Sequence, residues 1–181
     1  NITLKEYVEG SVIKMVCVAQ LQHQIDVMPI LEVLKNNNKL HLTILGEDGT
    51  GERYNEVINY INNNAITNIE IIGKIDRKEM VDYLENKDIG VSPMITSSIP
   101  NKIFDYMAAM LPIIVLGDND SSNFVVENNI GWQCNFNSKD LNILLKSIKT
   151  TDIQSKKKQV ISIRDEFSRD ILHKKIKYII T

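Results

Sequence analysis

The chain has 181 residues, of which 43% are hydrophobic and 24% charged, as expected for one soluble globular domain long enough to bury a core. A net charge of −2 gives no reason to expect nucleic acid as a partner. No apolar run reaches the ~18 residues of a membrane span, and the cysteines and histidines lack the spacing of a metal site.

The two cysteines and the start of the chain bear on compartment and domain organisation. Cys17 and Cys134 lie inside apolar runs, so we expect buried, reduced thiols in a cytosolic protein. Residues 1–11 show little periodicity and are interpreted as a lead-in or interdomain linker, and 12–181 as a single domain. Because the chain opens at Asn1 without Met and soon enters a strand, we expect a longer parent protein with further sequence upstream.

Apolar runs alternate with helical periodicity along the chain. The predicted strands are 12–19, 40–45, 68–73, 88–92, 112–116 and 130–134. The predicted helices are 25–35, 52–62, 76–84, one from 101, a short one capped by Ser121 or Ser122, one capped by Ser138, and then 153–167 and 168–180. This alternation predicts an α/β fold, a Rossmann-like doubly wound parallel sheet of about six strands with helices on both faces and C-terminal helices. Its ligand site should lie at the carboxyl ends of the strands.

The segment 96–115 combines a hydroxyl-rich loop, Pro100, a helix and a buried strand. Ser97 or Ser98 is the predicted N-cap. Residues at helical spacing predict one buried face: Ile103, Phe104, Met107, Ala108 and Leu111. Lys102 and Asp105 lie on the other face, and a lysine beside free helix N–H groups suits a phosphate. From the local pattern alone, an ordinary capped helix is favoured over a phosphate site. The position at the ligand edge makes the two interpretations about equally favoured.

Other nucleotide and catalytic motifs fit poorly. Gly46–Gly51 follows the second strand, has the wrong spacing for a dinucleotide fingerprint and is interpreted as a tight turn. No Walker loop, nucleophile elbow or Ser/His/Asp arrangement is present in the sequence. A phosphorelay receiver needs an acidic pair, an aspartate and a lysine, where this chain has Gln20 and Gln22, Gly73 and Gly117.

The string Ser98-Ile99-Pro100-Asn101-Lys102-Ile103-Phe104-Asp105-Tyr106-Met107-Ala108-Ala109, followed by Leu111-Pro112-Ile113-Ile114-Val115, resembles the C-terminal domain of GT-B glycosyltransferases of the retaining, family-four type. Bacterial members that build surface polysaccharides show similar strings. Segments 42–49, 69–75, 126–132 and 167–169 support the resemblance, which covers about 12–180.

The resemblance implies a domain that binds a nucleotide diphosphate-sugar, most readily a UDP-sugar, without a metal or other cofactor. Asp105 would bind the ribose hydroxyls, and Lys102 with the backbone near Ser98 and Ile99 would face the diphosphate. The loop around Lys74 and Ile75 would hold the base. Asn101 and Ser97 complete the candidate donor site, in which no catalytic residue is assignable.

Two departures leave alternatives open. Ser97 stands where the family has its first glutamate, which commonly contacts the donor sugar, and the loop 20–24 lacks basic residues. The donor half of a glycosyltransferase is therefore weighed against a degenerate binding or assembly module and, less favoured, a nucleotide-sugar epimerase. The acceptor, a saccharide or a lipid-linked molecule, would be held mostly by the N-terminal domain, so we expect this chain alone to be inactive.

Two basic clusters suggest the cellular setting. The run 156–158 and the lysines at 174, 175 and 177 are interpreted as solvated helix faces, with contact to anionic lipid headgroups as the weaker alternative. We accordingly expect a cytoplasmic protein. The alternative is a cytoplasmic protein that attaches peripherally to the inner face of the membrane.

Overall fold

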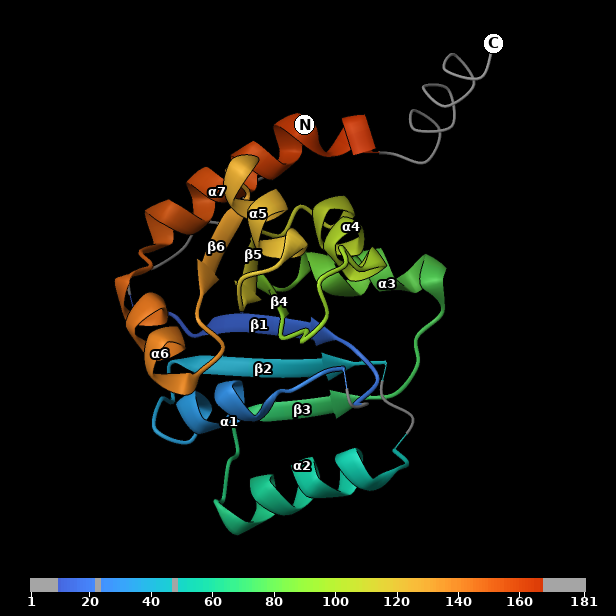
Figure 1. Ribbon diagram of the computed structural model, residues 1–181, viewed down its shortest axis with the longest axis vertical. Coiled ribbons are helices and arrows are strands. Elements are labelled where there is room, and N and C mark those ends of the chain that lie inside the picture. Colours follow the sequence, from blue (N-terminus) through green and yellow to red (C-terminus); the bar gives the residue numbers. More distant parts are fainter. Residues whose placement is uncertain (1–9, 22–23, 47–48, 168–181) are drawn as a thin grey trace.

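The computed structural model describes residues 10–21, 24–46 and 49–167. Within them the chain forms one parallel sheet of six strands in the order β3-β2-β1-β4-β5-β6 (Figure 1). The strands are β1 (Ile13–Val18), β2 (Leu40–Leu45), β3 (Ile69–Ile72), β4 (Ile89–Ser92), β5 (Ile113–Leu116) and β6 (Gly131–Cys134). The predicted fold class is confirmed, and the second strand has the predicted bounds.

Helices cover both faces of the sheet, as a buried parallel sheet requires. They are α1 (Met28–Leu34), α2 (Glu52–Asn63), α3 (Arg77–Glu85), α4 (Asn101–Ala108), α5 (Asp120–Glu127), α6 (Ser138–Ser147) and α7 (Thr150–Ile163), followed by the 3₁₀ turn η1 (Arg164–Phe167). Side chains of α1, α2 and α6 share one hydrophobic cluster, and those of α3, α4 and α5 share the other. Helix α7 joins the first cluster through Ile153 and the second through Val160.

Three helices end on a non-glycine residue in the left-handed conformation. Ala65 after α2, Met110 after α4 and Asn129 after α5 have φ of 49°, 60° and 56°. Each terminus has the two hydrogen bonds of a Schellman motif; after α4 these run from Leu111 N–H to the Tyr106 carbonyl at 2.9 Å and from Met110 N–H to the Met107 carbonyl at 3.0 Å. A pattern that places helix ends at glycine therefore misses these three.

The predicted N-caps are wrong by one to three residues. Asn119 caps α5, accepting from Ser122 N–H at 3.1 Å, and Asn137 caps α6, accepting from Asp140 N–H at 2.8 Å. Pro100, rather than Ser97 or Ser98, precedes α4. In α5 and α6 the asparagine carbonyl reaches the N3 amide from one to three residues before the serine that the sequence pattern favoured.

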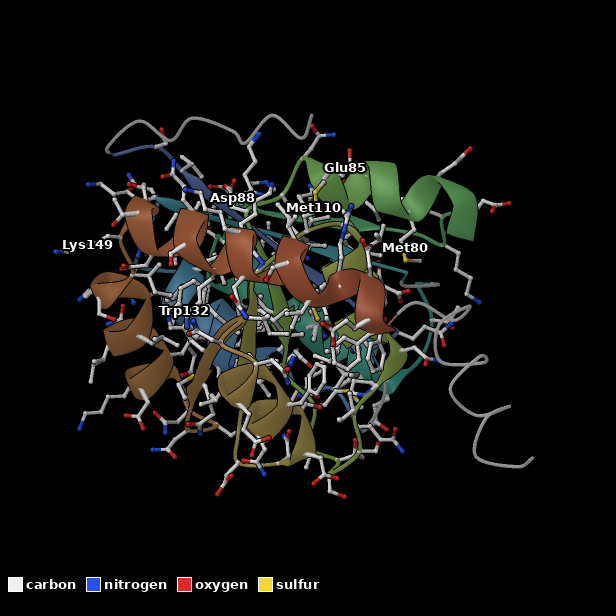
Figure 2. All side chains as sticks on the ribbon, turned by 90° about the horizontal axis from the view of Figure 1, so that it is seen from above. Met80, Glu85, Asp88, Met110, Trp132 and Lys149 are labelled. Carbon is white, nitrogen blue, oxygen red and sulfur yellow. The ribbon has the colours of Figure 1, made fainter. Side chains whose placement is uncertain are left out.

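The lysine run at the centre of α7 does not form the solvated face that we expected. Lys157 is buried, and the Lys156 ammonium lies 5.9 Å from the Trp132 ring centroid and donates to the Asn129 side chain. Figure 2 shows Trp132 beneath the opening turns of α7. Only Lys158 of the run is exposed, and Lys156 contributes to the docking of α7 on β6. The second basic cluster and the helix predicted at 168–180 lie outside the described residues.

Candidate functional site

The strand order places the ligand edge between β1 and β4. Chain connections leave β1 toward β2 on one side and β4 toward β5 on the other, so this is the point at which the strand order reverses. The loops that follow the six strands all emerge at the same edge because the strands are parallel. The loop after β4 leads directly into α4, and this loop and helix together carry six of the eight candidate residues.

The start of α4 is open to an acceptor. No side chain caps it, and the first amide used inside the helix belongs to Ile103, which donates to the Pro100 carbonyl at 3.0 Å. Among the described residues, nothing accepts from the N–H groups of Asn101 and Lys102. A helix start with free N–H groups carries partial positive charge and favours an anion. Here α4 differs from α5 and α6, whose starts are closed by asparagine side chains.

Lys102 adds a full charge to this helix start. Burial lowers the pKa of its ammonium below the ordinary lysine value, and the nearby Cys17 thiol opposes that shift. Burial also raises the pKa of Cys17, which is fully buried, so this thiol stays neutral and does not pair with the ammonium. Lys102 makes no hydrogen bond or ion pair with any described residue. A largely dehydrated cation without a partner is costly, and a bound anion would offset that cost.

The loop between β4 and α4 is fastened on both sides. The Ser97 and Ser98 carbonyls accept, each at 3.2 Å, from Asp120 N–H and the Ser121 hydroxyl at the start of α5. On the opposite flank the loop after β1 pairs with it in an antiparallel bridge between Ile25 and Met94. These contacts engage the carbonyls of Ser97 and Ser98, whose side chains are exposed.

Two hydroxyl groups beside this loop are buried without a partner. Ser92 ends β4 and is fully buried, and Thr96 lies in the loop itself. Neither hydroxyl has a hydrogen-bond partner in the described structure. Buried hydroxyls are normally satisfied, so their position at the ligand edge marks a place where polar atoms of a ligand or water belong.

The remaining candidates lie around the same edge at different depths. Asp105, one turn into α4, is half-buried, and Asn101 is exposed at the helix start. Ile99 is 37% exposed in the loop before it. Lys74 is exposed after β3, whereas Ile75 packs against the hydrophobic cluster that contains Ile103 of α4. The structure thus joins the β3 loop to α4 through Ile75 and leaves Lys74 at the surface.

The buried face of α4 differs from the predicted one. Ile103 and Met107 are buried as predicted, but Ala108 is exposed and Tyr106 takes the central place. Tyr106 is fully buried, and its hydroxyl accepts from Val18 N–H at 2.8 Å and donates to the Val91 carbonyl at 3.0 Å. Sequence reasoning missed Tyr106, Ser92 and Thr96, because their partners, or the absence of partners, depend on strands far along the chain.

A metal site and a membrane span were searched for in the described part of the chain. It holds no group of three or more His, Cys, Asp or Glu side chains arranged to bind a metal ion. None of its helices has the length and apolar character needed to cross a bilayer. The cytoplasmic setting and peripheral membrane contact expected from the sequence remain predictions.

Solved structures with the same fold include three glycosyltransferases. HepE from Anabaena in complex with UDP matches with a TM-score of 0.83 at 11% identity, over 94% of this chain and 49% of that one. A glycosyltransferase from Rickettsia africae gives 0.76 at 18% identity, over 93% and 47%. WaaG, involved in lipopolysaccharide biosynthesis, gives 0.73 at 12% identity, over 91% and 45%.

The chain therefore spans about half the length of the solved proteins it matches. No curated protein sequence matches it. The family described as "Glycosyl transferases group 1" matches residues 13–156, which includes every described strand and the whole candidate site. With its six-stranded Rossmann-like sheet and the open start of α4 at the switch point, the chain belongs to the group 1 glycosyl transferases, as a domain like the C-terminal half of a GT-B enzyme.

Proposed function

We propose that this chain is the donor-binding domain of a glycosyltransferase that moves a sugar from a nucleoside diphosphate-sugar to a saccharide or lipid-linked acceptor. The observation that carries the proposal is Lys102, a largely dehydrated ammonium that has no hydrogen bond or ion pair with any described residue and lies beside the uncapped start of α4. Both features favour a compact, multiply charged anion, and a diphosphate has that character.

The chemistry of the site suits stabilisation of a leaving group. As the glycosidic bond to the donor breaks, negative charge grows on the diphosphate oxygens. The Lys102 ammonium and the first amides of α4 lie at fixed positions, so they can stabilise that charge without reorganising. Asp105 is one turn deeper and, by its resemblance to the family, would accept from the ribose hydroxyls. HepE was solved with UDP and with UDP-glucose, which supports a uridine donor for this chain as well.

Titration calorimetry of the 181-residue chain with UDP tests the proposal. We expect binding by the wild type and losses of at least about tenfold in affinity for Lys102→Met and for Asp105→Ala, because each removes a charged hydrogen-bonding group. Lys158→Met is the matched control, since Lys158 is exposed on α7. Absence of binding by the wild type, or equal affinities for the Lys102→Met and Lys158→Met variants, would refute the proposal.

A binding or assembly module is the second candidate function, and Ser97 motivates it. Its exposed hydroxyl stands at the position of the family's first glutamate, and its carbonyl is held by Asp120 N–H at 3.2 Å. The side chain therefore cannot supply a carboxylate to the donor sugar. The full-length protein, assayed with UDP-, GDP- and ADP-sugars and mixed saccharide acceptors, separates the two functions. Turnover supports the transferase, and nucleotide binding without turnover supports the module.

A further inference from the structure

The pairing between β1 and β4 stops short of the ligand edge. Its register joins Met15 to Ile89 and Val16 to Gly90 only, whereas β1 pairs with β2 from Ile13 to Val18. Alternate residues of a strand face each neighbour, and Ala19 N–H donates to β2, so Val18 N–H points toward β4. With Val16 opposite Gly90, the next rung of a regular ladder would run from Val18 N–H to the Val91 carbonyl.

The Tyr106 hydroxyl occupies the place of that rung. It accepts from Val18 N–H at 2.8 Å and donates to the Val91 carbonyl at 3.0 Å. Two hydrogen bonds through an inserted oxygen take the place of one direct bond, so the carboxyl ends of β1 and β4 stand further apart than a regular ladder allows. The Val18 N–H and the Val91 carbonyl are nevertheless both hydrogen-bonded, so the wider spacing leaves neither group without a partner.

The Tyr106 ring is held rigidly in this position. It is fully buried, and a Cβ placed on Gly90 would lie 2.5 Å from its Cγ atom, so the ring rests directly on the β4 backbone. Glycine at position 90 is therefore what lets the ring lie flat against the strand. The carboxyl end of α4 is also anchored, because Arg164 donates to the Ala108 carbonyl at 3.0 Å.

The face of α4 that carries Tyr106 also carries Lys102. Lys102 and Tyr106 are four residues apart and lie on one face of α4, one turn above the other. The hydroxyl of Tyr106 is bound at Val18, and the Cys17 thiol beside Val18 is near enough to oppose the lowering of the Lys102 pKa. Both side chains of α4 therefore lie toward the end of β1.

We propose that Tyr106 is a positioning residue of the donor site. Its hydroxyl keeps the ends of β1 and β4 apart and fixes α4 across them, so that Lys102 and the first α4 amides are held at the ligand edge. This inference rests on the proposed function, because the consequence it predicts is read as affinity for a nucleoside diphosphate. It assigns Tyr106 no contact with the ligand.

Tyr106→Phe isolates the hydroxyl, because the ring keeps its place over Gly90. We expect the affinity for UDP, measured by titration calorimetry on the 181-residue chain, to fall about tenfold or more. Tyr83→Phe is the matched control: its hydroxyl lies 3.4 Å from the Lys87 ammonium and is not among the bonds of Val18 or Val91, so its loss should leave the affinity unchanged within about twofold.

A double-mutant cycle with Lys102→Met separates positioning from general stability. If Tyr106 acts by placing Lys102, its loss costs less than about threefold in the Lys102→Met background, since that lysine is no longer there to misplace. An unchanged affinity for Tyr106→Phe, or the same loss in both backgrounds, overturns the inference while leaving the proposed function standing. Absence of UDP binding by the wild type overturns both.

A measurement on the wild type covers the case in which Tyr106→Phe does not fold. Long-range NMR couplings across hydrogen bonds should show Ala19 N–H bonded to the Leu45 carbonyl, at 2.9 Å, but no direct bond from Val18 N–H to the Val91 carbonyl. A nuclear Overhauser effect between the Tyr106 hydroxyl proton and Val18 N–H is the positive sign. A direct Val18–Val91 coupling means an unbroken ladder and overturns the inference without reference to any ligand.

Discussion

Ala65→Gly should make this protein more stable, although glycine usually weakens a fold. Ala65 is the residue after the cap of α2, with φ of 49°, and it closes a Schellman motif through Ile66 N–H to the Ile61 carbonyl at 3.1 Å. In this conformation an L side chain brings its Cβ close to the following carbonyl oxygen, and glycine has no Cβ. The methyl group of Ala65 is exposed, so its removal leaves no cavity.

Two opposing terms set the size of the gain. The left-handed conformation costs an L residue about 1–2 kcal/mol, and glycine loses about 0.5–1 kcal/mol more backbone entropy than alanine on folding. The difference favours the variant by about 0.5–1 kcal/mol. For a chain of this length that is a rise of roughly 1–4 °C in Tm.

Urea and thermal unfolding, followed by circular dichroism, measure the change. We expect a higher urea midpoint with an unchanged m-value, because the exposed surface hardly differs. Ala108→Gly is the control: Ala108 is exposed and is the last residue of α4, without a positive φ, so the same substitution should destabilise by up to about 0.5–1 kcal/mol. If both variants lose stability equally, Ala65 carries no conformational strain and the reasoning is refuted.

Three further predictions concern charge, capping and packing. The affinity for UDP should fall as the pH rises toward the ordinary lysine range, because only the charged form of Lys102 attracts the diphosphate and burial lowers the pKa of its ammonium; calorimetry should show a flat profile for Lys102→Met, and an equal slope in both proteins would contradict this role. Asn119→Ala should cost about 1 kcal/mol in urea unfolding, because α5 loses the acceptor for its Ser122 amide, and a change below about 0.3 kcal/mol would show that the cap is not needed. Gly131→Ala should cost about 3 kcal/mol or prevent folding, since the new Cβ would lie 1.8 Å from the Ile113 carbonyl oxygen, and wild-type stability would mean that β5 and β6 separate easily.

The sequence was sufficient to predict the fold because burial acts locally on strand and helix patterns. The apolar run at 40–45 became β2 with the same bounds, and the alternation of strands and helices predicted the six-stranded parallel sheet. The helix around Lys102 also starts, as predicted, at the carboxyl edge of the sheet. These features depend on neighbours within a few residues, which a pattern can see.

What escaped prediction depends on contacts between distant parts of the chain. The role of Tyr106 requires Val18, 88 residues away, and Gly90, whose missing side chain admits the ring. The burial of Lys157 and the docking of Lys156 on Trp132 follow from the place where α7 packs on β6. A helical pattern shows that such residues are spaced along one face, but it does not show what that face meets.

The short pairing between β1 and β4, called the seam below, also bears on how the chain folds. Strands β1 to β3, and likewise β4 to β6, pair with strands that follow each other along the chain, so each group can assemble through fairly short loops. The seam instead joins residues such as Lys14 and Asp88, 74 positions apart, through two register pairs and the hydrogen bonds around them. Closing the longer loop is slower, so we expect the two groups to form first and the seam last. Until then β1 and β4 each present an unpaired strand edge, the stage at which neighbouring chains are most prone to pair with each other and aggregate.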